Sequence, residues 1–275
     1  MPFHVQPLRS LDLPELAPYR TMRRQLEQRQ EGIFVAEGEK VVRRLLQSNL
    51  TVASVLLPDK WFRELEPLLR ARTDDMSVFV AEKELLETLT GFSMYQGLLA
   101  VGRVPPALDL DEVLDRSARP WLLAAVDGLS SAENLGAVVR NCAAFNVHAL
   151  ITDQTSASAF LRRAVRSSMG AVFELPILES KSLAARLGEL RDRGVRCIAA
   201  HPRPGSCALP ESDLRGDCCI IFGSEGSGIS SEVLQRCDET AAIPMPPNVD
   251  SLNVGSAAAV FLYEANRQRG VKRER

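Results

Sequence analysis

The chain has 275 residues, of which 45% are hydrophobic and 25% charged. This composition is typical of a globular protein with one large or two modest domains. The formal net charge is only -2, which excludes a uniformly basic surface, so any nucleic-acid binding must come from local patches.

The N-terminal sequence MPFHVQPLRS lacks the unbroken apolar core of a signal peptide. No apolar run approaches the ~20 residues that span a bilayer. We therefore expect a cytoplasmic protein that does not associate with membranes.

The first hundred residues alternate apolar runs with helical patterns. They predict helices at 16–30, 39–48, 60–71 and 82–89, and strands at 33–36, 52–57, 77–80 and 97–104. A break follows, because Pro105 and Pro106 precede an acidic stretch that ends at Pro120. This stretch indicates a linker, or a helix across the junction, and divides the chain into a domain at 1–104, a linker at 105–119 and a domain at 120–275.

The same alternation returns after the break. It predicts strands at 121–126, 148–152, 174–178, 196–200, 218–222 and 240–244, and helices at 134–146, 158–168, 181–193, 230–237 and 252–268. Such alternation indicates an α/β fold with parallel sheets covered by helices on both faces. Ligands of these sheets bind beyond the carboxyl ends of the strands, so the loops at 127–134, 201–207, 223–230 and 245–253 are the candidate site.

The first of three conspicuous segments is NLGAVVRN, residues 134–141. On a helical wheel its apolar residues form one arc, and Arg140 lies on the other side among residues with small side chains. A ligand or another backbone could approach Arg140 closely. Taken alone, the segment is better explained by an ordinary exposed arginine on an amphipathic helix.

The second segment is FGSEGSGIS, residues 222–230, which follows an apolar strand. Its glycines allow positive φ and close approach of backbone to a ligand. The order G-x-x-G-x-G matches neither the dinucleotide pattern nor a P-loop, so a phosphate-binding loop is not indicated. Glu225, between the glycines, could face a cationic ligand or simply lie in a solvent-exposed turn.

The third segment, IPMPPNVDSLNVGSAAAVFLYEA, covers residues 243–265. Prolines stiffen its loop, and Ser251 and Asn253 lead into a helix whose small residues at 255–259 permit close packing. Backbone donors at such a helix start suit a polar ligand edge. Phe261, Leu262 and Tyr263 further along could face a second subunit or form core within one chain.

The six cysteines include no C-x-x-C pair, and the three histidines lie far apart in the sequence. We therefore predict no metal site and a reducing compartment. His201, just after a predicted strand, is the one histidine near a candidate loop, and we interpret it as an ordinary loop residue.

Arginines gather in three stretches, around 20–29, 162–166 and 267–275. Each stretch alone is explained by solvated surface charge. If the chain binds RNA, Arg23, Arg24, Arg162 and Arg163 are the basic candidates for substrate contact.

In this order and spacing, the three segments resemble the motifs of the SpoU (TrmH-like) class of SPOUT RNA methyltransferases. The resemblance covers about residues 119–269 and includes SSMGAVFELPI at 167–177. IFVAEGEKVVRRLL at 33–46 and MYQGLLAVGRV at 94–104 resemble, less specifically, a substrate-binding domain related to ribosomal protein L30e. The resemblance implies a deep trefoil knot at the carboxyl end, S-adenosyl-L-methionine as methyl donor and a homodimer with the site near the interface.

The resemblance also implies roles for individual residues. Arg140, Glu225, Ser251 and Asn253 are the expected catalytic residues. Gly223, Ile243, Met245 and Leu252 are expected to contact the donor, and Asn134 the substrate. Where Ser131-Ala132-Glu133 stands, family members often have a proline, so the loop shape can differ.

The implied reaction is methylation of a ribose 2′-hydroxyl of ribosomal or transfer RNA. The hydroxyl must lose a proton, and a neutral arginine is costly because its pKa exceeds ~12. We therefore expect Arg140 to clamp RNA phosphate and stabilise developing alkoxide charge rather than act as the base. Two alternatives remain open: an inactive RNA-binding homologue and a SPOUT enzyme that methylates a base.

Overall fold

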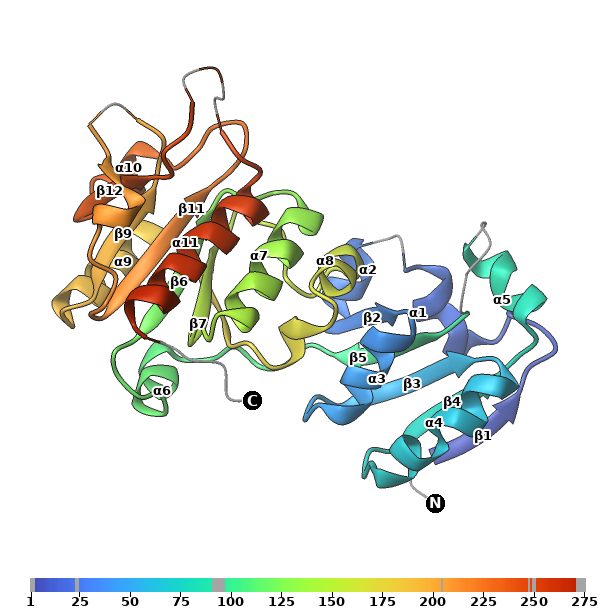
Figure 1. The fold of residues 1–275 in the computed structure, drawn as a ribbon. Coiled ribbons are helices and arrows are strands. Elements are labelled where there is room, and N and C mark those ends of the chain that lie inside the picture. The colour runs from blue at the N-terminus through green and yellow to red at the C-terminus, as the bar shows by residue number, and fades with distance from the viewer. Residues whose placement is uncertain are drawn as a thin grey trace. The chain divides into compact units, whose positions relative to one another are not determined.

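The computed structural model describes residues 3–22, 25–90, 97–203, 205–246, 248 and 251–270. The chain forms two compact units, drawn as ribbons in Figure 1. The first unit contains Met1–Pro106 together with Phe160–Phe173, and the second contains Ala107–Ala159 and Glu174–Arg275. The segment Phe160–Phe173 thus groups with the first unit, whereas the partition drawn from the sequence placed it in the second domain.

The sheet of the first unit has five strands. Their order is β1 (Phe3–Pro7), β4 (Met76–Val80), β3 (Val52–Leu57), β5 (Leu99–Arg103) and β2 (Ile33–Glu37). β1, β4 and β3 run parallel, but β5 is antiparallel to both β3 and β2. The expectation of a purely parallel sheet is therefore wrong for this unit. Leu99 to Val101 are all buried, so both faces of β5 are covered. A strand of consecutive apolar residues looks the same in the sequence whether it runs parallel or antiparallel to its neighbours.

Three predicted helices of the first unit are present: α3 (Glu39–Gln47), α4 (Asp59–Ala71) and α5 (Lys83–Thr90). The helix predicted over 16–30 is instead η1 (Pro14–Leu16), α1 (Ala17–Arg20) and α2 (Gln25–Gln30). The side chain of Gln28 donates to the carbonyl of Pro18 at 3.3 Å. Ten residues of straight helix would separate these groups by ~15 Å, so Pro18 and Gln28 cannot belong to one straight helix.

The segment Phe160–Phe173 contains α8 (Arg162–Ser167) and η2 (Ala171–Phe173), and it packs on β2. The ring of Phe34 on β2 contacts the rings of Phe160 and Phe173, with centroids 5.3 and 5.5 Å apart. Gly102, opposite Phe34 in the antiparallel pair, makes room for this ring, because a Cβ there would lie 2.3 Å from it. Aromatic packing therefore binds the segment to the first sheet.

A buried carboxylate strengthens the same contact. Glu37 at the end of β2 is 8% exposed and accepts from the guanidinium groups of Arg162 and Arg166, the latter at 2.9 Å. A buried charge is tolerated only when it is paired in this way.

The sheet of the second unit has seven strands, all parallel. Their order is β10 (Cys207–Ala208), β12 (Glu239–Ala242), β9 (Arg196–Ala200), β11 (Cys218–Gly223), β6 (Leu122–Asp127), β7 (Ala149–Asp153) and β8 (Ile177–Ser180). The six predicted strands are all present, with boundaries shifted by a few residues. Only the two-residue β10 was not predicted.

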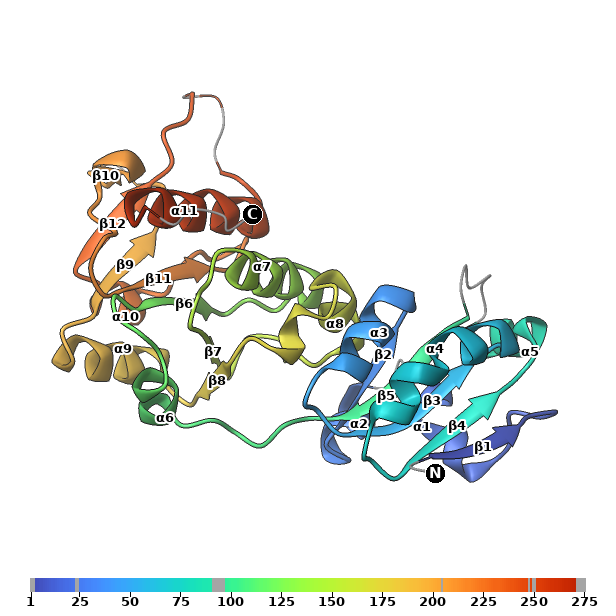
Figure 2. The same cartoon turned by 60° about the horizontal axis from the view of Figure 1, so that its bottom comes forward.

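Helices cover both faces of this sheet, as Figure 2 shows. One face packs against α6 (Leu110–Asp115), α9 (Leu183–Asp192) and α10 (Ser231–Leu234), whose apolar residues join the strands in one core. The other face carries α7 (Ala132–Ala144) and α11 (Val254–Gln268). The stretch at 105–119, for which a linker or a helix across the junction was predicted, contains the helix α6, whose apolar residues belong to the core of the second unit. No helix in the described ranges is long and apolar enough to cross a bilayer.

The strand order shows that the chain crosses its own earlier elements. β11 lies between β6 and β9, and after β12 the chain returns to pack α11 against β11 and α7. At the crossing, a Cβ on Gly255 would lie 2.9 Å from the Cβ of Ala137, and Asn141 donates to the carbonyl of Gly255 at 2.6 Å. The close packing predicted for residues 255–259 is thus present at Gly255.

The sequence left two interpretations open for Phe261, Leu262 and Tyr263 on α11: core within one chain, or contact with a second subunit. Phe261 and Leu262 are buried at 2% and 0% exposure, so they are core within one chain. Phe261 packs edge-on against Phe222 of β11. Tyr263 alone of the three is exposed, at 59%.

Candidate functional site

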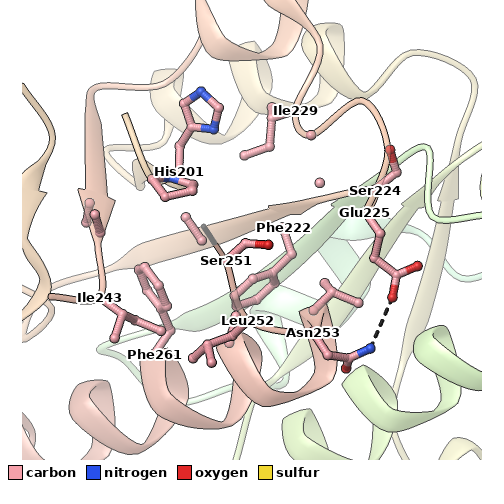
Figure 3. Close-up of a pocket in the computed structure, with 18 of the residues that line it drawn as sticks. His201, Phe222, Ser224, Glu225, Ile229, Ile243, Ser251, Leu252, Asn253 and Phe261 are labelled. Atoms are coloured by element: carbon pink, nitrogen blue, oxygen red, sulfur yellow. Dashed lines mark hydrogen bonds between the residues drawn. The ribbon is translucent and has the colours of Figure 1, made fainter. Parts of the chain in front are cut away.

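A cavity of about 430 Å³ opens at the carboxyl ends of β9, β11 and β12, where the sequence analysis expected a site. This volume is within the ~300–1,000 Å³ typical of small-molecule sites. The four residues predicted to contact a donor, Gly223, Ile243, Met245 and Leu252, all line it. So do three of the predicted catalytic residues, Glu225, Ser251 and Asn253, several of them drawn in Figure 3.

A tight turn after β11 positions Glu225. Ser224 and Gly228 exchange two backbone hydrogen bonds, of 3.1 and 2.9 Å, and Gly228 has a φ of +70°. A Cβ on Gly223 would lie 2.2 Å from the carbonyl carbon of Gly228, so the turn closes only because position 223 is glycine. Gly223 therefore allows a close backbone–backbone contact, whereas the close approach to a ligand expected from the sequence stays a prediction, and Glu225 projects from the turn.

Asn253 is held by the start of α11. Its side-chain oxygen accepts from the backbone N–H of Gly255 at 2.9 Å, which makes it the N-cap of this helix. The cap fixes the orientation of the amide, so Nδ2 points away from the helix. Nδ2 donates to Oε1 of Glu225 at 3.0 Å, drawn as the dashed line in Figure 3.

Asn134 completes a triangle of side chains with Glu225 and Asn253. It lies in the first turn of α7, where Ser131 caps the helix and accepts from its backbone N–H at 3.3 Å. Its Nδ2 donates to Oε1 of Glu225, and its Oδ1 accepts from Nδ2 of Asn253 at 3.1 Å. One residue from each of the three sequence motifs thus meets at one point.

The triangle leaves part of the carboxylate available. Both amide groups donate to Oε1, and no hydrogen bond to Oε2 is present among the described residues. Among the described residues that line the cavity, none is a lysine or arginine, and Glu225 is the acidic one. A cationic ligand is the kind that such an electrostatic environment favours.

Arg140 lies apart from this triangle within one chain. It is exposed on α7, is not among the residues that line the cavity, and has no hydrogen bond or ion pair with the described residues. It is therefore available to a group that approaches from outside, such as a phosphate.

The predicted RNA-binding arginines differ in their surroundings. Arg23 and Arg24 lie outside the described residues. Arg163 is exposed on α8. The side chain of Arg162 is only 16% exposed and forms an ion pair with Glu37, which the sequence did not reveal.

His201 lines the cavity, although the sequence analysis interpreted it as an ordinary loop residue. Its Nε2 is buried and has no hydrogen-bond partner in the described part of the chain. Burial lowers the pKa of His201, and the nearby Arg203 lowers it further. The signal that could have identified it is its place directly after β9, at the edge of the sheet where ligands bind.

No group of three or more His, Cys, Asp or Glu side chains suited to a metal ion occurs within the described ranges. Cys197 and Cys219 of the second sheet are instead buried in its apolar core, and the half-buried Cys237 packs against that core. Burial raises the pKa of Cys197 and of Cys237, each to about 12.

Comparison with known proteins relates the chain to one family of RNA methyltransferases. Residues 122–263 match the model of the SpoU rRNA Methylase family. An uncharacterised tRNA/rRNA methyltransferase of Mycobacterium avium is 35% identical over 211 residues, which are 75% of this chain and 67% of the relative. Another from Mycobacterium bovis is 31% identical over 245 residues, covering 86% of this chain and 82% of the relative.

Solved structures show the same likeness over nearly the whole chain. The SpoU methyltransferase AviRb from Streptomyces viridochromogenes, in complex with the cofactor AdoMet, has a TM-score of 0.81 and 26% identity. It covers 95% of this chain and 100% of its own. A structure described as an RNA 2′-O ribose methyltransferase has a TM-score of 0.79 and 25% identity, with 98% and 100% covered. These similarities confirm the expected α/β fold with its knotted carboxyl end.

Proposed function

The chain belongs to the SpoU rRNA methylase family, and we propose that it transfers a methyl group from S-adenosyl-L-methionine to a ribose 2′-hydroxyl of ribosomal or transfer RNA. The observation that carries the proposal is the triangle of Asn134, Glu225 and Asn253 at the mouth of the cavity. Each residue comes from a different motif, and the three meet only because the chain end returns across the sheet.

The residues around the cavity fit the donor. S-adenosyl-L-methionine supplies a sulfonium-bound methyl group, and the sulfonium is a cation. Glu225 presents a carboxylate to this cavity, and none of its described lining residues is a lysine or arginine that would repel the positive charge. The apolar walls include Ile229, Leu252 and Phe261, which suit the uncharged parts of a nucleoside.

A ribose acceptor requires groups that hold RNA and manage charge on the oxygen. We propose that Arg140 binds an RNA phosphate with its planar guanidinium and stabilises charge that develops on the 2′-oxygen. Glu225, Ser251 and Asn253 would orient the acceptor at the cavity mouth. Holding both reactants in line removes several kcal/mol of barrier without any covalent step by the protein.

The first unit is proposed to bind RNA outside the cavity. RNA substrates exceed one active site in size, and Arg163 and Arg166 are exposed on the segment that packs on β2. Arg23 and Arg24 remain candidates from the sequence. The likeness of this unit to ribosomal protein L30e remains a prediction.

A cytoplasmic homodimer is the proposed working form. Val260 and Tyr263 on α11 are 39% and 59% exposed, and the ring of Tyr263 contacts Phe145 at the end of α7. Exposed apolar side chains of this kind gather at interfaces. Arg140 is exposed on α7 as well, so a second copy that covered this surface would bring its own residues near the RNA-binding side.

The proposal is tested by methyl transfer from labelled S-adenosyl-L-methionine to total RNA from a strain that lacks the gene. Label is expected to enter RNA and to resist removal of the bases. Donor binding without label in any RNA fraction would instead favour the inactive homologue. Label released with the bases would favour a base methyltransferase.

A further inference from the structure

His201 has a fixed backbone and an unsatisfied side chain. Its N–H donates to the carbonyl of Ala241 at 2.9 Å, and its carbonyl accepts from the hydroxyl of Ser206 at 2.9 Å. These bonds hold the residue at the carboxyl end of β9. Its Nε2 is nevertheless buried and without a partner among the described residues. A buried polar nitrogen without a hydrogen bond costs free energy, which a bound ligand can recover.

The imidazole lies at the cavity wall beside the turn that carries Glu225. A Cβ built on Gly228 would lie 3.9 Å from Cε1 of His201, the atom next to Nε2. Figure 3 shows His201 and Ile229 across the cavity from Leu252 and Phe261, with Glu225 toward the other end. A ligand that reached Glu225 with one end would place its other end near His201.

The surroundings of His201 suit a neutral heteroaromatic group. Pro202, Ile229 and Ala242 line the cavity with it, and none of the described lining residues is a lysine or arginine that could bind a carboxylate. Burial, with Arg203 beside it, lowers the pKa of His201, so the imidazole is neutral at pH 7 and presents one nitrogen that donates or accepts. The charged amino-acid end of a methyl donor would be poorly matched to these walls, whereas a purine edge fits them.

We propose that Nε2 of His201 forms a hydrogen bond with the adenine edge of the methyl donor and so positions the sulfonium end toward Glu225. The inference rests on the proposed function, because it takes S-adenosyl-L-methionine as the ligand. It adds a positioning residue from β9 to the three motifs, and this residue acts on the part of the donor that does not react.

The test is calorimetric titration of the full-length protein with two ligands, S-adenosylhomocysteine and 5′-methylthioadenosine. Both contain adenine, but only the first has the amino acid. His201→Phe keeps a planar ring and removes the polar nitrogen. This substitution is expected to lower the affinity for both ligands by the same factor, about three- to tenfold, which corresponds to the loss of one neutral hydrogen bond. The matched control, His4→Phe at an exposed position outside the cavity, should change neither affinity.

A second measurement reports on the nitrogen itself. The protein has only three histidines, so their imidazole ¹⁵N signals can be assigned by comparison with His201→Phe. Addition of S-adenosylhomocysteine should shift the Nε2 signal of His201 and leave those of His4 and His148 in place. A purely structural histidine would show no such shift.

The outcomes separate this inference from the proposed function. Loss of S-adenosylhomocysteine affinity alone, with 5′-methylthioadenosine unaffected, would place the contact at the amino-acid end and overturn the adenine assignment. Equal binding of both ligands by wild type and His201→Phe would overturn the role of His201 but leave the donor assignment intact. Failure of wild type to bind either ligand would overturn the proposed function and this inference with it.

Discussion

Nδ2 of Asn253 lies 3.0 Å from Oε1 of Glu225, across 28 positions of sequence. The same amide caps α11 through its oxygen, which accepts from Gly255 at 2.9 Å. The start of the last helix and the orientation of the carboxylate therefore depend on one side chain. The following variants separate these two functions.

Asn253→Asp should remove activity while preserving the fold. Aspartate caps a helix as well as asparagine does, so α11 keeps its start. It has no N–H to donate, and it places a second negative charge beside Glu225, which like-charge repulsion would displace. We expect methyl transfer to fall at least about a hundredfold, as when one preorganised donor is removed from an active site.

The measurement is single-turnover methyl transfer beside thermal unfolding. Asn253→Ala, which loses the cap and the donor together, is the comparison and should also lower the unfolding temperature. An active Asn253→Asp variant would show that the hydrogen bond to Glu225 is not needed.

Gly255→Ala tests the close crossing of α7 and α11. The added Cβ would lie 2.9 Å from the Cβ of Ala137 and 3.2 Å from the oxygen of Asn253. Overpacking of this kind costs about 1–3 kcal/mol, which exceeds the gain in helix propensity. Denaturant unfolding should therefore show lower stability. Ser256→Ala, at the exposed next position, is the matched control and should be neutral or slightly stabilising.

Arg140→Lys separates a phosphate clamp from a general base. A clamp needs the planar, two-pronged guanidinium, so lysine should cause a large loss of rate that higher pH does not restore, with donor affinity unchanged. A base must lose its proton, and lysine, with a reference pKa of ~10.4, does so more easily. We expect the first result in single-turnover rates measured against pH at saturating RNA. A rate that climbs toward wild type at alkaline pH would contradict the clamp.

The proposed dimer depends on the exposed end of α11. Tyr263→Asp places a charge where the ring of Tyr263 is 59% exposed and should convert a dimer to a monomer at micromolar concentration, measured by light scattering. Val5→Asp on the edge strand β1 changes a residue of similar exposure, 44%, and should leave the dimer intact. A monomeric wild-type protein would overturn the proposed dimer.

The sequence predicted the second unit well because its strands are continuous apolar runs separated by helical patterns. Its three motif loops could be assigned to one edge because parallel strands share their carboxyl ends. The direction of β5 was not predictable, since Leu99 to Val101 are buried on both faces in either direction. The hydrogen bond between Gln28 and Pro18, which excludes one straight helix there, is a tertiary contact that no local pattern reveals.

The sequence also did not predict which segments that are distant along the chain pack against each other. Nothing in the periodicity of residues 160–173 indicates that Phe160 and Phe173 pack on Phe34, or that Arg162 pairs with Glu37. Deletion of residues 1–104 would therefore leave these side chains without their partners. Point substitutions, rather than this truncation, are the sounder way to assign RNA binding to the first unit.

Methylation of a ribose 2′-oxygen is tested most directly by the position of the methyl group in the product. RNA treated with the protein and S-adenosyl-L-methionine is digested to nucleosides, whose sugar and base fragments are separated by mass spectrometry. Glu225→Gln, which keeps the size of the side chain, serves as the control for background modification. Our expectation is one nucleoside with a methylated sugar and an unmodified base, which is absent with Glu225→Gln. A methyl group on the base fragment would contradict it.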